Sequence, residues 1–268
     1  MDPGAAIPIG PTQPHPVDDL AAAEIRAAVV AGELRPWYQP IVELRTGRIV
    51  GAEALARWHS PDGAVRTPDT FLPVAERSGL VLDVDRAIFV QALTDLARWQ
   101  QIRPDFRVSV NLSGRHLDRP ELPSQLTTAV TAAGVASASV DLEITETARP
   151  TDLTTSRDVV ARLGERGHTV WLDDFGTGWS SLQDLITLPV GGIKLDRTFA
   201  GHLGTRVGAA VIGALTTAAD QVGFKVTIEG LEHRHQVEQA RALGCHYGQG
   251  YWWARPCSAT AVTAMLTE

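Results

Sequence analysis

Two adjacent carboxylates, Asp173 and Asp174, stand between an apolar run at 169–172 and a glycine-containing loop that extends to residue 182. An apolar run of this length, rich in β-branched and aromatic residues, is typical of a buried strand in a parallel sheet. Neighbouring carboxylates at the end of such a strand repel each other unless a cation or a proton offsets their charge, which suggests a metal site. Because Asp is also common in helix caps and turns, the pair alone leaves both interpretations open.

Polar side chains also follow most of the other strand-like segments. They are Glu53, Asn111, Glu143, Lys194, Glu229 and Gln249. With the aspartate pair, the carboxylates and an amide of this set offer oxygen ligands, which match hard divalent cations such as Mg²⁺ or Mn²⁺ and not a zinc site built from Cys and His. The number of carboxylates suggests two ions, the recurring arrangement for phosphodiester hydrolysis. Lys194 would then orient the attacking water or neutralise the phosphate.

Several other polar and aromatic residues are better explained by structure than by chemistry. His233 and His235 fall at the start of a predicted helix, so we interpret them as surface residues and not as a metal pair. Asp196 is interpreted as structural, closing the loop that follows it. Three tryptophans are expected to pack in the core or barrel, namely Trp58, Trp99 and Trp171.

Strand and helix patterns alternate along the chain and would position the polar residues. Strands are predicted at 37–42, 49–56, 106–111, 140–144, 169–172, 191–196 and 224–230, with a last short strand within 245–253. Helices are predicted at 17–34, after residue 69, and at 83–101, 122–133, 156–167, 207–222 and 234–243, with a helix or turn at 182–187. The turn at 45–47 suits a hairpin, so the first two strands are expected to be antiparallel.

This alternation is typical of a (β/α)8 barrel. A doubly wound open sheet is the alternative, but it would usually carry a glycine-rich phosphate loop after its first strand, and the segment EALARW at 53–58 contains no glycine. In a barrel the loops that follow the strands meet on one face. The polar residues at the strand ends could therefore share one pocket.

The composition of the chain excludes several classes of function. Its 268 residues, 44% of them hydrophobic and 21% charged, are typical of a globular protein with one large domain or two small ones. The formal charge of −7 argues against a general nucleic-acid surface. No apolar stretch reaches the roughly 18 residues that a membrane helix needs. The proline-rich residues 1–16 read as a tail or linker and not as a secretion signal. Two cysteines without a metal-binding spacing suggest a reducing cytoplasm.

Eight motifs occur in an order that resembles the EAL domain family of cyclic di-GMP phosphodiesterases. They are YQPIV at 38–42, EALARW at 53–58, NLS at 111–113, EITE at 143–146, DDFGTG at 173–178, KLDRTF at 194–199, EGLE at 229–232 and QGYWWARP at 249–256. The match extends from about residue 20 to the C-terminus. Any one motif would be weak, but the ordered set is highly specific.

The resemblance implies a fold, an activity and partners. It implies one domain at 17–268, a TIM-like α/β barrel with one antiparallel strand near the start, preceded by a tail at 1–16. Members of the family hydrolyse cyclic di-GMP to linear pGpG with Mg²⁺ or Mn²⁺, so two such ions, a cyclic di-GMP substrate and a homodimer are expected.

The resemblance also implies a role for individual residues. One metal would be held by Glu53, Asn111, Glu143 and Asp173, and Asp173 would bridge to a second ion held with Asp174. Lys194 and Glu229 would position or deprotonate the water, with Glu229 also a metal ligand, and Gln249 would complete the metal and water shell. The dinucleotide would contact Gln39, Leu55 and Arg57, the last of these at a phosphate, for which a guanidinium is suited. Glu146 would anchor the loop after Asp174, which lies at the dimer contact of the family.

Two other functions stay open at this point. Some members of the family have lost catalysis and act as cyclic di-GMP receptors, although they usually lack several of the acids that this sequence keeps. A barrel that only docks other proteins is the third possibility. The departures from the family pattern are Trp179 for Tyr, Ile228 for Ala, His246 for an acid and Trp253 for Phe. Of these, Ile228 and Trp253 bear on packing or turnover more than on metal binding.

Overall fold

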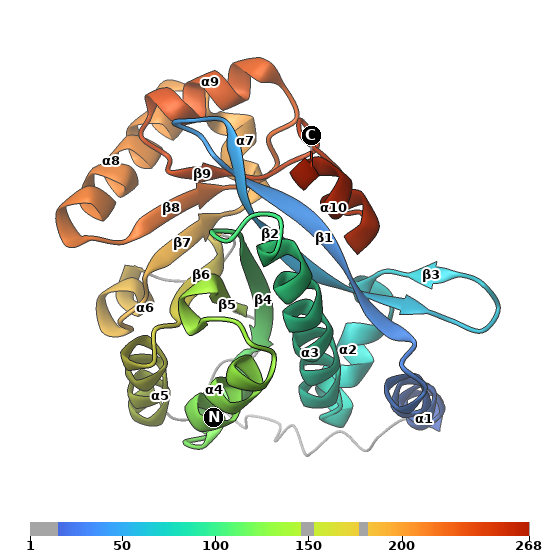
Figure 1. Ribbon diagram of the computed structural model, residues 1–268. Coiled ribbons are helices and arrows are strands. Elements are labelled where there is room, and N and C mark those ends of the chain that lie inside the picture. Colours follow the sequence, from blue (N-terminus) through green and yellow to red (C-terminus); the bar gives the residue numbers. More distant parts are fainter. Residues whose placement is uncertain (1–15, 146–152, 177–181, 268) are drawn as a thin grey trace, which may run out of the picture.

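The computed structural model describes residues 16–145, 153–176 and 182–267. Within them a sheet of nine strands has the order β1-β9-β8-β7-β6-β5-β4-β2-β3, and a further pairing of β1 with β2 closes eight of these strands into a barrel (Figure 1). The eight are β1 (Leu34–Glu43), β2 (Arg48–His59), β4 (Arg107–Ser113), β5 (Val140–Thr145), β6 (Thr169–Phe175), β7 (Gly192–Leu195), β8 (Lys225–Ile228) and β9 (Tyr247–Gly248). The predicted barrel is confirmed.

Strand β1 is the antiparallel member of the barrel. It runs antiparallel to both of its neighbours, β2 and β9, whereas the other adjacent pairs in the ring are parallel. The expected hairpin between the first two strands is therefore correct. The two strands continue past the barrel, where the two-residue strand β3 (Val65–Arg66) pairs with the end of β2. We expected a loop in place of β3.

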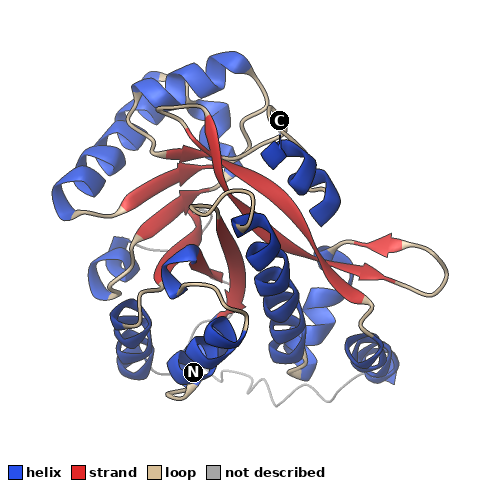
Figure 2. Ribbon diagram, viewed as in Figure 1, coloured by secondary structure: helices blue, strands red, loops and turns tan. Residues whose placement is uncertain are grey.

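Helices surround the barrel on its outer side (Figure 2). They are α1 (Pro16–Ala31), α2 (Pro68–Ser78), α3 (Val81–Gln100), α4 (Leu122–Ala132), α5 (Leu153–Glu165), α6 (Leu182–Thr187), α7 (Arg197–His202), α8 (Arg206–Val222), α9 (Arg234–Ala242) and α10 (Ala259–Thr267), with short 3₁₀ helices at Gly114–Asp118 and Ser137–Ser139. The sequence did not predict α7 or α10. Asp196, expected to close a loop, caps α7 by accepting a hydrogen bond from the backbone N–H of Thr198. None of the helices formed by the described residues is long and apolar enough to cross a bilayer.

Alternation along the strands separates the core from the site. In β4, β5 and β6 the even-numbered residues, such as Val110, Leu142 and Leu172, pack outward in the hydrophobic core beneath the helices. The odd-numbered residues face the barrel interior, as the two-residue period of a strand requires. The interior positions therefore carry the polar side chains, and the outer positions stabilise the barrel. Three tryptophans expected in the core are buried, namely Trp58, Trp99 and Trp171.

Candidate active site

A single buried lysine lies at the centre of the polar cluster. The ammonium Nζ of Lys194, on β7, is 3.1 Å from Glu53 Oε2, 2.9 Å from Glu143 Oε2, 3.1 Å from Asp173 Oδ1 and 2.6 Å from Glu229 Oε1. Its side chain is 2% exposed. Four strands and the residue that follows a fifth thus deliver one cation and four carboxylates to one point, as the convergence of strand ends in a barrel predicts.

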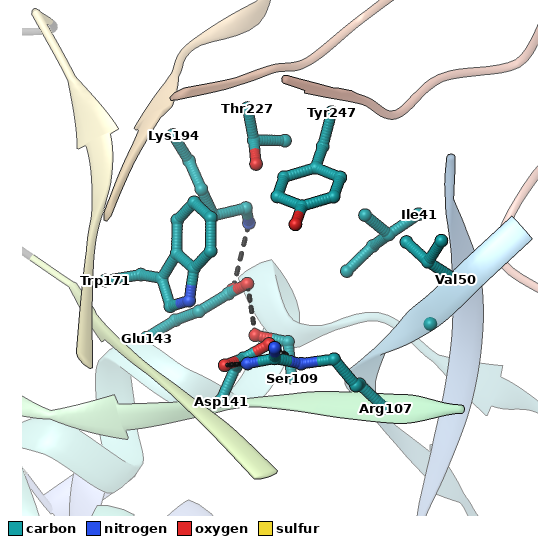
Figure 3. Close-up of a pocket in the computed structure, with 11 residues that line it drawn as sticks. Ile41, Val50, Arg107, Ser109, Asp141, Glu143, Trp171, Lys194, Thr227 and Tyr247 are labelled. Carbon is teal, nitrogen blue, oxygen red and sulfur yellow. Dashed lines mark hydrogen bonds and ion pairs between the residues drawn. The ribbon is translucent and has the colours of Figure 1, made fainter. Parts of the chain in front are cut away.

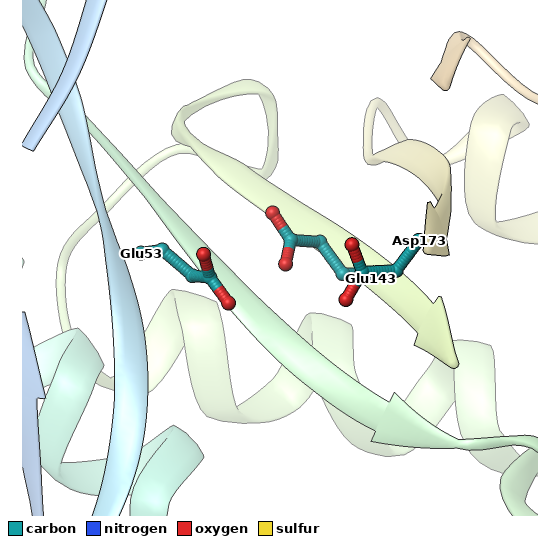
Figure 4. A group of neighbouring side chains, drawn as sticks. All are labelled: Glu53, Glu143 and Asp173. Carbon is teal, nitrogen blue, oxygen red and sulfur yellow. The ribbon is translucent and has the colours of Figure 1, made fainter. Parts of the chain in front are cut away.

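Sheet register accounts for this convergence. Asn111 on β4 stands opposite Glu143 on β5, and Gln39 on β1 stands opposite Glu53 on β2. Each of these side chains points to the same side of its strand as the barrel interior. Figure 4 shows Glu53, Glu143 and Asp173 together, each from a different strand. A shift of one residue in any of these strands would turn its acid out into the apolar core.

Two amide side chains orient Glu53. Asn111 Nδ2 donates to Glu53 Oε1 at 2.9 Å, and Gln249 Nε2 donates to Glu53 Oε2 at 2.8 Å and to Gln39 Oε1 at 3.1 Å. The amide oxygens of Asn111 and Gln249 are buried, and among the described residues they have no hydrogen-bond partner. Buried acceptors are rarely left unsatisfied, so these two oxygens are suited to a ligand.

The carboxylates form two groups that share one residue. Oxygen atoms of Glu53, Glu143 and Asp173 all lie within 4.8 Å of one another, and so do those of Asp173, Asp174 and Glu229. Asp174 is exposed and has a left-handed backbone with φ of 50°, at a place where the pairing of β6 with β7 is irregular. Asp tolerates that conformation better than most residues. The irregular backbone lets two successive acids serve one site, although a regular strand would point them to opposite faces.

Charge and burial shift the protonation of the cluster. Burial by itself would lower the pKa of Lys194, but the surrounding carboxylates raise that pKa well above its usual value. Burial, with the neighbouring carboxylates of Glu53 and Asp173, raises the pKa of Glu143. Burial also raises the pKa of Glu229 to about 8 and, with the adjacent Asp173, the pKa of Asp174 to about 6. One lysine therefore does not offset the negative charge that the site carries when ionised, and additional cations would.

The donor set fits a hard divalent cation. Carboxylate oxygens and the two unpartnered amide oxygens are ligands that Mg²⁺ and Mn²⁺ accept, and no Cys or His belongs to either group of carboxylates. Asp173 Oδ1 lies within ion-pair distance of Lys194 but makes no hydrogen bond to it, so this atom also retains capacity for a ligand. Asp173 is the residue that both groups have in common.

A small cavity lies on the inner side of the cluster, within the barrel, and Glu143 and Lys194 of the cluster contribute to its lining (Figure 3). Arg107 and Asp141 form an ion pair, with Arg107 Nε 3.1 Å from Asp141 Oδ2. Ser109 donates to Glu143 Oε1, on the opposite side of that carboxylate from Lys194. The sequence did not single out Ser109, although it precedes Asn111 by two residues and so shares its face of β4. This spacing was the available signal.

The residues expected to bind substrate lie next to the cluster. A cavity is lined by Glu53, Asn111 and Asp173, by Leu55, and by residues of α2 and α3 that include Leu72 and Ile88. The Arg57 guanidinium lies 5.5 Å from the centroid of the Trp37 ring and donates to the Ala56 carbonyl. Glu146 lies outside the described residues, as do residues 177–181 of the loop that it was expected to anchor.

Three of the four departures from the family pattern lie within the described residues. Ile228 is fully buried in the outer core, and Trp253 packs against that core. His246 Nδ1 accepts from the Val226 backbone N–H, and its Nε2 lies 3.2 Å from Asp220. Trp179 is outside the described part. The two expected surface histidines, His233 and His235, are exposed with stacked rings.

Two curated proteins from Escherichia coli (strain K12) resemble the chain. The probable cyclic di-GMP phosphodiesterase PdeB is 37% identical over 218 residues, which cover 81% of this chain and 42% of that protein. The oxygen sensor protein DosP is 33% identical over 93% of this chain and 31% of its own length. The chain thus spans less than half the length of these relatives.

Solved structures share the fold, and a family model covers most of the chain. The PaMucR phosphodiesterase in complex with c-di-GMP has a TM-score of 0.82 and 31% identity, over 91% of this chain and 99% of that one. The EAL enzyme Bd1971 in its cAMP and cyclic-di-GMP bound form has a TM-score of 0.86 and 29% identity, over 93% of this chain and 69% of that one. The model of the EAL domain matches residues 22–256. The chain therefore belongs to the EAL domain family.

Proposed function

We propose that this protein is a metal-dependent phosphodiesterase that hydrolyses cyclic di-GMP to linear pGpG. The observation that carries the proposal is the pair of carboxylate groups that share Asp173. Such a pair suits two cations held close together, the arrangement that recurs in phosphodiester hydrolysis. The family and the cyclic di-GMP complex of PaMucR support the choice of substrate.

The ligands in this proposal follow the two groups. Glu53, Asn111, Glu143 and Asp173 hold one Mg²⁺ or Mn²⁺ ion, and Asp173, Asp174 and Glu229 hold the second. When bound, such ions lower the pKa of a water molecule and stabilise negative charge on the phosphate in the transition state. Lys194 and Glu229 position or deprotonate the water, and the two side chains lie side by side, with the ammonium 2.6 Å from Glu229 Oε1. Gln249 orients Glu53 and offers its free amide oxygen to the water shell.

The substrate contacts in this proposal lie on β1 and β2. Gln39, Leu55 and Arg57 contact the dinucleotide, with the Arg57 guanidinium at a phosphate. A guanidinium is suited to this role because its planar N–H groups match two phosphate oxygens at once. Arg57 is 8% exposed and stands on the same strand as Glu53, so phosphate binding would complete its hydrogen bonds.

The proposal extends to the state of the protein in the cell. We propose a cytoplasmic homodimer whose domain occupies residues 17–268 after a tail at 1–16. Both cysteines are free, Cys245 among the buried residues, which suits a reducing compartment.

Glu146 is proposed to couple the dimer contact to the metal site through the loop after Asp174. The test is to compare Glu146→Ala with the wild type by sedimentation equilibrium, by Mn²⁺ affinity and by activity. The coupling proposal fails if the variant keeps full activity and metal affinity.

Chromatography of the nucleotides tests the proposed activity. Purified protein with Mn²⁺ should convert cyclic di-GMP to pGpG, and Glu53→Ala should abolish conversion because it removes a ligand that also pairs with Lys194 and two amides. Binding of cyclic di-GMP by the wild type without conversion would instead establish a receptor. If the wild type does not bind cyclic di-GMP at all, the barrel would be a docking scaffold.

A further inference from the structure

The inner face of β1 carries an aromatic residue next to the cluster. Tyr38 points outward, because its hydroxyl donates to Asp95 of α3 at 2.7 Å. Strand alternation therefore places Trp37, Gln39 and Ile41 on the inner side. Ile41 lines the interior of the barrel, and Gln39 bonds to Gln249 at the level of the carboxylates. Trp37 is the next inner residue, one step farther toward the mouth.

The register of β1 with β2 also places Trp37 on the inner face, beyond Gln39. Gln39 is opposite Glu53, Trp37 is opposite Leu55, and Arg35 is opposite Arg57. The inner face of this two-stranded ribbon thus continues outward from a metal ligand to an indole beside Leu55. Strand rise puts Trp37 roughly 7 Å beyond Gln39 along the strand. This distance is within the reach of a dinucleotide whose phosphate lies at the carboxylates.

The indole is held by side chains that are not part of the hydrophobic core. The Arg57 guanidinium lies 5.5 Å from the Trp37 ring centroid, and the His59 ring lies at 6.5 Å with a 59° angle between the planes. Trp37 is half-buried, whereas Trp58 and Trp99 of the same region are buried. A large aromatic ring with exposed surface next to a buried cationic group is suited to a flat ligand.

Strand β2 has β1 on one edge and β4 on the other. The cavity beside α2 and α3 lies next to the cluster on the β4 side. The carboxylates therefore have a cavity on one side and the indole on the other. A cyclic dinucleotide with its phosphate at the metal site has two bases to place. Bases stack on aromatic side chains, and the stacking needs no fixed hydrogen-bond pattern.

We infer that Trp37 binds one guanine base of the substrate by stacking and contributes to specificity for a purine dinucleotide. The inference rests on the proposed function and adds a residue to it. Arg57 has two tasks in this arrangement, since its guanidinium contacts a phosphate and fixes the indole. Trp37 itself takes no part in the chemical step. Its loss should therefore weaken binding and leave turnover at saturation intact.

Steady-state kinetics on cyclic di-GMP with Mn²⁺ test this inference in four proteins: wild type, Trp37→Ala, Trp37→Phe and Val65→Ala. The last is the control, because Val65 is an exposed residue of the short β3 on the same extension. Trp37→Ala should raise KM roughly 5- to 150-fold, the range for loss of one stacked base. Its kcat should stay within about twofold, because positioning of the reacting phosphate is retained. The KM of Trp37→Phe should lie between those of the wild type and Trp37→Ala.

Fluorescence gives an independent readout of the stack. Addition of pGpG to the wild type should quench tryptophan emission, and the quenching should shrink in Trp37→Phe. An unchanged KM in Trp37→Ala, or a fall in kcat without a rise in KM, would overturn the inference while conversion by the wild type upheld the proposed function. If the wild type converts nothing yet its emission is quenched through Trp37, the base contact stands and the enzyme proposal fails. If the wild type shows neither conversion of cyclic di-GMP nor quenching, both the proposed function and the role of Trp37 fail.

Discussion

Lys194 is the residue on which the metal-free site depends. Its ammonium is within 3.1 Å of an oxygen of each of four carboxylates, and its side chain is 2% exposed. Removing one partner of a buried ion pair leaves an uncompensated charge, which costs far more than the pair contributes. Here one cation serves four partners. The same lysine therefore has a structural task in the metal-free protein, in addition to the chemical task proposed for it.

The substitution Lys194→Met should destabilise the metal-free protein by about 3 kcal/mol or more, since partners of a buried charge lose their compensation. Mn²⁺ should then raise the unfolding temperature of the variant more than that of the wild type, because the ion supplies the missing charge. Thermal unfolding with and without metal measures both effects. Lys225→Met is a matched control, because the sequence has two lysines and Lys225 is exposed. Equal unfolding temperatures for both metal-free variants would contradict this role.

The sequence predicted the acids of the site, the lysine that pairs with them and the two amides that orient Glu53, but not Ser109 or Trp37. Asp173 and Asp174 are two adjacent carboxylates after an apolar run, and the polar residues at the other strand ends favoured a metal site there over a turn. Ser109 has no comparable signal in the sequence. Its role is recognised only in the structure, where the strand register places it beside Glu143. The sequence did not single out Trp37 either, because its place on the inner face follows from the outward bond of Tyr38 and from the register of β1 with β2.

At the scale of elements, close contact between β6 and β7 sets the shape of the barrel interior. Gly192 stands opposite Trp171, and a Cβ on this glycine would lie 2.3 Å from the indole ring. The glycine thus makes room for the tryptophan on the face that also carries Lys194, two residues later. Any side chain at this position would displace either Trp171 or β7.

Gly192→Ala should lower the free energy of unfolding by about 1–3 kcal/mol, the typical cost of overpacking, and should reduce activity because Lys194 shifts with the strand. Gly164→Ala is the comparison, since Gly164 lies in α5 with no heavy atom within 4 Å of an added Cβ. It should raise stability by up to about 1 kcal/mol, since Ala favours a helix more than Gly does. Urea denaturation distinguishes the two, and a neutral Gly192→Ala would disprove the packing argument.

At the scale of the whole molecule, one antiparallel strand completes an otherwise parallel barrel. Strand β1 joins β9 to β2 and so leaves no open edge between the first and last strands. The alternating pattern predicted this barrel because each strand has its own apolar run. It did not predict α7 or α10, the first because six residues are too few to show a helical period, and the second although the threonines of ATAVTAMLT recur at three- and four-residue steps. Strand β3 has only two residues and depends on its pairing with β2.

The negative charge of the assembled site, which comes from five carboxylates in four segments of the chain, leads to the proposal that the protein hydrolyses cyclic di-GMP only with divalent metal. The most direct test is the rate at which metal-stripped protein converts cyclic di-GMP to pGpG as Mn²⁺ is added. We predict no conversion without metal, a rate that rises to saturation with Mn²⁺, and no conversion by Asp173→Asn, which alters the residue common to both carboxylate groups. Conversion by the stripped protein, or wild-type rates in Asp173→Asn, would contradict it.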